Sequence, residues 1–192
     1  MISNDVRCNP TNSVWSSCMN KLFGLIAALS VLSEPAFADS TNQSDRLLDR
    51  LVGRWVLSGT IAGKKTMHDV SAEWVLNHGY VRLHEVAREK DLAGAAAYEA
   101  IVFISHDPSS GDYSCLWLDS TASWGLSAEA IGRAKANANS IPFVFKDPDG
   151  HVSFENTFSY NPAADTWGWS MDNIRNGKHE PFGRVTLVKA PH

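Results

Sequence analysis

The stretch Tyr98–Ser120, YEAIVFISHDPSSGDYSCLWLDS, contains two strand-like runs of residues separated by one short turn. The runs Ala100–Ser105 and Tyr113–Asp119 are rich in β-branched and aromatic side chains, which favour strands. Pro108 presets φ for a turn, and Gly111 adopts a positive φ at little cost. Because so short a connection cannot cross over to a parallel neighbour, the two strands must pair antiparallel.

The rest of the chain repeats this design of short strands separated by turns. Apolar and polar residues alternate in runs such as Tyr80–Arg88 and His151–Tyr160, and Asn176–Gly177 is a hairpin turn dipeptide. The Ala-rich segment Leu126–Ala134 has helical character, but we expect a strand because its neighbours require antiparallel continuation. Pro142 suits an edge strand or a bulge. The pattern gives roughly nine or ten strands and predicts an all-β antiparallel sandwich or barrel.

One short helix is expected before the first strand. The segment Asp45–Val52, DRLLDRLV, repeats apolar residues at helical spacing, with Ser44 placed to cap its start and Gly53 to end it. A helix of about two turns is not stable alone, so we expect it to pack on the sheet.

Composition and charge narrow the class of protein. The chain has 192 residues, of which 44% are hydrophobic and 20% charged, as suits one globular domain with its own core. The net charge is −4 and no basic stripe is present, which argues against nucleic acid and against an anionic membrane surface as partners. The sequence predicts no oligomeric state.

The first part of the chain resembles an export signal. Lys21 precedes the apolar run Leu22–Leu32, which is too short to span a bilayer, and Ala36-Phe37-Ala38 fits a small-x-small cleavage site. We expect residues 1–38 to be a leader, with translation starting at Met19, and residues 39–192 to form a single domain that is periplasmic or secreted. After cleavage no contact with a membrane is expected. Cys115 would then be the one cysteine left, so no internal disulfide can form.

Gly53 and Trp55 open the first expected strand directly after the short helix, as in the G-x-W motif of lipocalins and other calycins. The resemblance implies an up-and-down β-barrel of about nine or ten strands with the tryptophan at its closed end. In these proteins an Arg or Lys of the last strand often lies across the ring, and Arg184 is the residue we expect there.

A closer likeness covers Leu51 to Lys189. Over this range the chain resembles a bacterial family of secreted, calycin-like domains of unknown function. The matching elements are Leu51-Val52-Gly53-x-Trp55, Trp74 with His78-Gly79-Tyr80-Val81, Tyr98-Glu99, and Trp117-Leu118-Asp119-Ser120. The family implies a fold and brings no agreed activity. Its usual paired glycine in the second turn is His78-Gly79 here.

Seven histidines raise the question of a metal or haem. None of them forms a pair at i, i+2 on an expected strand or at i, i+4 on a helix, and no cysteine accompanies them. We therefore expect no metal site and no cofactor. Haem, as in the haem-binding barrels of the calycin group, is the alternative, and His84 would then be the better ligand because it lies in mid-strand.

Carboxylates are the next candidates for chemistry. Inside a barrel, apolar walls raise the pKa of a carboxyl group and suit it to general acid or base catalysis. Glu155 and Asp172 alternate toward water, whereas Asp119 shares a strand face with Trp117. If the protein is an enzyme, Asp119 and His84 are the catalytic candidates.

Tryptophan gives the clearest indication of a ligand. Six of the seven tryptophans lie after residue 38, more than closing a small barrel requires. We expect a small apolar or aromatic molecule to bind in the barrel interior, because such sites combine apolar walls with a few polar groups. The candidate ligand-binding residues are Trp117, Asp119, His84, Arg82, Tyr113 and Trp169. The alternatives are a cofactor-free enzyme, of lyase or isomerase type, that transfers a proton on such a molecule, and a structural domain with a filled core.

The leader generates the first testable prediction. Mass spectrometry of the exported protein is expected to show Asp39 at the N-terminus, because cleavage follows the small-x-small site. An exported protein that retains Met19 would contradict this prediction.

Overall fold

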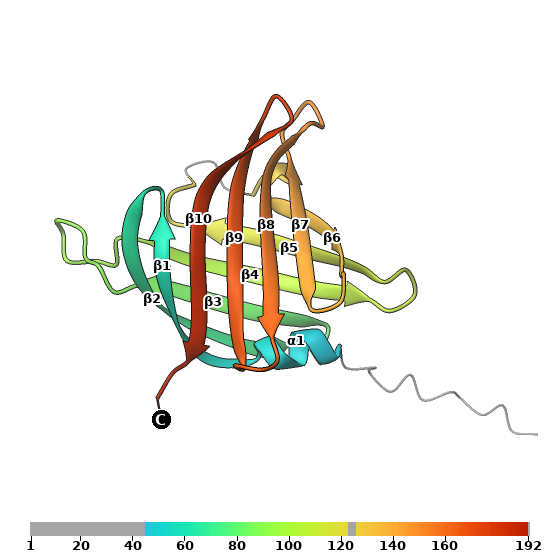
Figure 1. Cartoon of the computed structure of the whole chain (residues 1–192), viewed down its shortest axis with the longest axis horizontal. Coiled ribbons are helices and arrows are strands. Elements are labelled where there is room, and N and C mark those ends of the chain that lie inside the picture. Colours follow the sequence, from blue (N-terminus) through green and yellow to red (C-terminus); the bar gives the residue numbers. More distant parts are fainter. Residues whose placement is uncertain (1–44, 123–125, 192) are drawn as a thin grey trace, which may run out of the picture. The chain divides into compact units, whose positions relative to one another are not determined.

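The computed structural model describes residues 45–122 and 126–191 of the chain. In this part, ten antiparallel strands form one closed barrel in which sequence neighbours pair and β1 also pairs with β10 (Figure 1). The strands are β1 (Gly53–Ile61), β2 (Lys64–Val75), β3 (Tyr80–Ala87), β4 (Glu99–Asp107), β5 (Asp112–Asp119), β6 (Ile131–Lys135), β7 (Ser140–Lys146), β8 (Val152–Asn161), β9 (Thr166–Arg175) and β10 (Lys178–Lys189). The all-β, up-and-down prediction is confirmed.

Two short helical elements accompany the strands within residues 45–122 and 126–191. The helix α1 (Arg46–Leu51) precedes β1, and one 3-10 turn, η1 (Ala128–Ala130), precedes β6. The strand expected across 126–134 therefore begins only at Ile131. No helix in the described segments is long and apolar enough to cross a membrane. The predicted leader, residues 1–38, lies outside the described residues.

The hairpin of β4 and β5 has the predicted antiparallel pairing, with Val102 opposite Trp117 and Ala100 opposite Asp119. Pro142, expected at an edge or a bulge, lies in β7 between two neighbouring strands. The pairing of β7 with β6 is nonetheless short, and Arg133 opposite Val144 is the register pair that defines it in the described strands. Proline has no N–H to donate to a neighbouring strand, which fits a position beside a strand pair with few backbone hydrogen bonds.

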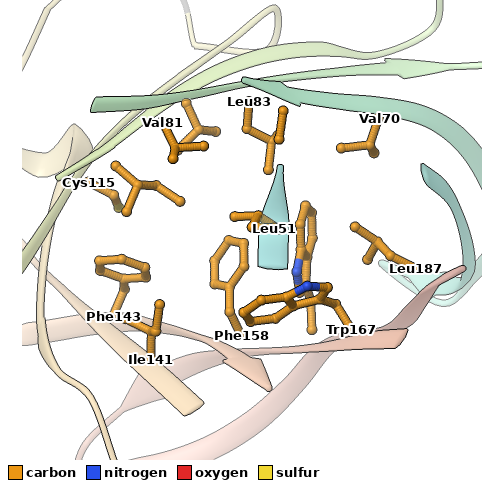
Figure 2. Packing of buried hydrophobic residues seen from close by; sticks show 14 of the residues in the cluster. Leu51, Val70, Val81, Leu83, Cys115, Ile141, Phe143, Phe158, Trp167 and Leu187 are labelled. Carbon is orange, nitrogen blue, oxygen red and sulfur yellow. The ribbon is translucent and has the colours of Figure 1, made fainter. Parts of the chain in front are cut away.

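Alternate residues of each strand point into the barrel. On β3, Val81, Leu83 and Glu85 are buried inside, whereas Arg82 and His84 lie on the outer face. Side chains from opposite walls meet in the interior: Figure 2 shows Val81 and Leu83 facing Phe143 of β7 and Phe158 of β8. The last two rings pack edge to face, with centroids 5.7 Å apart. Such offset aromatic pairs add to the stabilisation that burial alone provides.

The helix α1 packs at one end of the barrel and shares its core (Figure 1). Leu48 and Leu51 have no exposed surface. The indole Nε1 of Trp55 donates to the carbonyl of Leu51 at 2.7 Å, and that of Trp167 donates to the carbonyl of Arg50 at 3.2 Å. These bonds satisfy carbonyls that the end of a helix otherwise leaves without partners. Two tryptophans of the barrel thus fix a helix too short to be stable alone.

The first residue of the described chain caps α1. The Asp45 side chain accepts hydrogen bonds from the backbone N–H groups of Leu47 and Leu48, at 2.8 and 3.3 Å. Its other oxygen lies 3.3 Å from Nδ1 of His106 in β4. The helix is therefore held by the sheet at both of its ends. Ser44, the cap expected from the sequence, lies outside the described residues.

The cation over Trp55 is Lys189, and the prediction of Arg184 is wrong. Lys189 Nζ lies 3.8 Å from the centroid of the Trp55 ring, and the two residues are register partners of β10 and β1. Arg184 lies five residues earlier on the opposite face of β10, where its guanidinium donates to Asp172 at 2.6 Å. Strand parity explains the error, because Arg184 and Lys189 must point to opposite sides.

Truncation of Trp55 is expected to be costly. Trp55→Ala removes a ring that is 1% exposed together with its bond to α1, and should lower the free energy of unfolding by about 3–5 kcal/mol. The control Lys189→Met removes only the cation and should cost about 1 kcal/mol or less. Urea unfolding measures both values. Equal midpoints for Trp55→Ala and the natural protein would contradict this account of the closed end.

Candidate functional site

The half of the barrel away from α1 contains a cavity of about 640 Å³. Its lining includes Asp119 and Phe145 at the ends of β5 and β7, and Phe154 near the start of β8. Leu126 and Ser127, directly before η1, also line it. The helix α1 lies at the other end of the barrel, where β9 begins, because Trp167 near the start of β9 contacts it. The barrel therefore has one packed end and one hollow end.

Aromatic rings form much of the cavity wall. Phe154 of β8 packs edge to face against Phe145 of β7 and against Phe182 of β10, with centroids 6.0 and 5.9 Å apart. Across from them, Trp117 of β5 lines the cavity and packs edge to face on Trp169, at 6.4 Å. Rings held by other rings keep their positions, so the cavity has preformed apolar walls.

Asn156 is a buried polar side chain in the cavity lining. It is 1% exposed, and its Oδ1 has no hydrogen-bond partner among residues 45–122 and 126–191. The neighbouring indole Nε1 of Trp169 is also without a partner in the described part of the chain. An unpaired buried polar atom costs free energy, so each such atom requires an explanation. For Asn156, a hydrogen-bond donor located in the cavity would supply the missing partner.

Tyr98, just before β4, brings a hydroxyl group to the cavity. Its oxygen accepts a hydrogen bond from Trp117 Nε1 at 3.2 Å, which fixes the indole. Burial raises the pKa of the Tyr98 hydroxyl far above its usual range, and the carboxylates of Glu85 and Asp119 raise it further. Tyr98 therefore stays neutral in the cavity wall and can take part in hydrogen bonds.

A buried polar network lies behind Tyr98. His68 Nδ1 is 2.5 Å from Oε1 of Glu85, and its Nε2 is 2.6 Å from Oγ1 of Thr66. The side chains of His68 and Glu85 lie inside the barrel, where the residues are 4% and 2% exposed. The imidazole stacks on the ring of Tyr98 with centroids 5.6 Å apart. Both ring nitrogens of His68 are thus engaged, as a buried histidine requires.

Sequence reasoning missed part of this network. Glu85 shares the inner face of β3 with Val81 and Leu83, at the spacing of two residues that places side chains on one face of a strand. His68 lies in β2, which begins at Lys64. The sequence does contain a signal for His68, because it precedes the inward-facing Val70 by two positions and therefore lies on the same face of the strand.

The predicted ligand-binding residues lie in three places. Trp117 and Asp119 line the cavity, and Trp169 lies directly behind Trp117. Tyr113 lies on the same face of β5 but nearer α1, where its ring stacks on His106 at 4.5 Å. These positions follow from the inward face that β5 presents with alternate residues.

Arg82 and His84 lie elsewhere, on the outer surface of β3. Arg82 forms an ion pair with Glu73, and His84 Nε2 is 2.6 Å from Oε1 of Glu99. Neither side chain is among those that line the cavity. The expected grouping of these two residues with Trp117 and Asp119 is therefore not what the structure has, because the inner face of β3 is the one with Leu83.

Asp119 orders the mouth of the cavity. Its Oδ1 accepts hydrogen bonds from the backbone N–H and the hydroxyl of Thr121, at 2.8 and 2.5 Å, and from the N–H of Ala122 at 3.1 Å. These bonds fold the chain back after β5. Among the described lining residues, the charged ones are Asp119 and Glu129, and both are acidic.

Two other reactive groups do not extend the site. Burial raises the pKa of the Cys115 thiol to about 12, so at neutral pH the sulfur is an unreactive part of the core. Asp147, Asp149 and His151 lie together in the turn between β7 and β8. There Asp147 accepts a hydrogen bond from the N–H of His151 at 2.8 Å, as is common in turns.

Comparison with known proteins adds no family or function. No family model matches the chain, and no curated protein matches it significantly.

Two His–Glu pairs of similar geometry allow a matched test of the inner network. Glu85→Ala leaves buried His68 without its partner and should lower the free energy of unfolding by about 3–5 kcal/mol. Glu99→Ala breaks the exposed pair with His84 and should cost at most about 1 kcal/mol. The measurement is urea unfolding at neutral pH. Similar small losses in both variants would show that the Glu85 pair is not buried as described.

Proposed function

We propose that the protein is a periplasmic or secreted barrel that binds a small apolar or aromatic molecule in its hollow half. The observation that carries the proposal is the cavity of about 640 Å³ with aromatic walls. Ligand sites in proteins commonly have volumes of roughly 300–1,000 Å³ and combine apolar walls with a few polar groups. The barrel is compatible with a calycin-like fold, and we propose that relation for it.

The contrast between the two halves favours a ligand over a filled core. Near α1, large side chains such as Trp55, Trp167 and Phe143 are completely or almost completely buried. In the other half, Trp117 and Phe154 remain only partly buried and border open space. Burying such rings against a bound molecule is favourable by about 25 cal/mol per Å² of apolar surface. A core that served stability alone would gain by filling this space.

The proposed ligand carries an apolar or aromatic body and a polar group. The body packs between Trp117 and the rings of Phe154 and Phe182, while the polar group meets Asn156 or the Tyr98 hydroxyl. We propose binding without a cofactor, because no histidine lies in the described lining to hold a haem iron. His84, the haem ligand considered from the sequence, is on the outer face and paired with Glu99.

A second candidate function is proton transfer on the bound molecule. It rests on Asp119 and Tyr98, which both line the cavity, and on the His68–Glu85 pair behind Tyr98. Asp119 would act as the base and the Tyr98 hydroxyl would stabilise developing negative charge. Ligand recovered after incubation in deuterium oxide would then carry deuterium bonded to carbon, a position that does not exchange without a base. The exchange should disappear in Asp119→Asn, which keeps the Oδ1 that folds the mouth.

Binding is tested by intrinsic fluorescence during titration with fatty acids, alcohols, amines and phenolics. We expect saturable quenching, and we expect Trp117→Phe to reduce it because this indole forms part of the wall. Trp74→Phe is the control, since Trp74 bonds to Asp49 of α1 at the other end of the barrel. A flat response across the whole panel, or equal quenching in both variants, would contradict the proposed site.

A further inference from the structure

We propose that the cavity selects ligands whose polar group is a protonated amine and that it discriminates against carboxylates. This inference rests on the proposed binding function and assigns the chemical class of its ligand. Three independent features of the cavity support it: the sign of its charges, its unpaired acceptor and its aromatic walls.

The charges of the lining have one sign. Asp119 and Glu129 are acidic, and among the described lining residues there is no Lys, Arg or His. One oxygen of Asp119 folds the mouth through Thr121 and Ala122, which keeps the carboxylate at the entrance to the cavity. An acidic rim attracts a cation and repels an anion, and low-dielectric walls strengthen both effects. A fatty-acid carboxylate would find no cation among the described lining residues to pair with.

The buried acceptor is the second feature. Asn156 Oδ1 has no partner in the described chain, although the residue is 1% exposed and lines the cavity. An ammonium group has three N–H donors and no acceptor, so it can satisfy this oxygen. An ionised carboxylate has only acceptors and would place a further unpaired acceptor against it. The missing partner of Asn156 is therefore a donor.

The aromatic walls are the third feature. Trp117, Phe154, Phe182 and Tyr98 surround the space, and the face of an aromatic ring attracts a cation. The field around Tyr98 has the same preference, because the carboxylates of Glu85 and Asp119 help to raise the pKa of its hydroxyl. These ring faces and carboxylates offset part of the cost of removing an ammonium group from water, whereas for a carboxylate the described lining offers hydroxyl donors but no cation.

The test uses three ligands that share one chain and differ in the head group: decylamine, decanol and decanoate. Isothermal titration calorimetry at neutral pH measures each dissociation constant with the full exported protein. We expect decylamine to bind about tenfold more tightly than decanol, and decanoate to bind more weakly than both. In the double variant Asp119→Asn, Glu129→Gln, the ratio of the affinities for decylamine and decanol should fall from about ten toward one.

Two further variants make the outcome specific. Asn156→Leu removes the buried acceptor and should weaken decylamine and decanol alike, since both donate a hydrogen bond to it. Asp112→Asn removes an acidic group at the other end of β5, where it pairs with Lys135, and should change nothing. Decanoate binding as tightly as decylamine, or a double variant that keeps the preference, would overturn this inference alone. Failure of all three ligands to bind would overturn the proposed binding function as well.

Discussion

The architecture depends on two indole N–H groups that bind the last carbonyls of a six-residue helix. Trp55 and Trp167 come from β1 and β9, two strands separated by β10 in the closed barrel. Their bonds hold α1 against one end of the barrel, and Asp45 fixes the other end of the helix to His106. A helix this short has little stability of its own, so its position comes from these contacts and from the burial of Leu48 and Leu51.

Once one end is closed in this way, the location of the site follows. The large rings near α1 fill their half of the barrel, and the remaining space lies in the opposite half. There the strands still alternate inward and outward residues, but the inward ones are Trp117, Asp119, Phe154 and Asn156, which leave a cavity between them. Closed ends give a barrel its stability, whereas open ends are where a ligand can enter. The half of the barrel near α1 thus provides the packed core, and the opposite half provides the proposed binding site.

Periodicity predicted most of the fold and part of the site. The period of two identified the hairpin of β4 and β5 and the shared face of Trp117 and Asp119. It also contained the information that His84 lies outside, because Val81 and Leu83 already mark the inner face of β3. Tyr98 and Asn156 could not be assigned from the sequence, since their roles depend on the closure of β1 on β10 and on which residues then meet across the interior. The alternation of residues along a strand determines which face each side chain occupies, but it does not determine which side chains it meets across the barrel.

The location of the ligand is the central claim, and one measurement tests it most directly. A crystal of the protein grown with a bromine-tagged alkylamine would locate the bound molecule through the anomalous scattering of bromine. The account predicts a single strong peak among Trp117, Phe154 and Phe182, in the half of the barrel away from α1. A peak beside α1, or one on the outer face near His84, would contradict it.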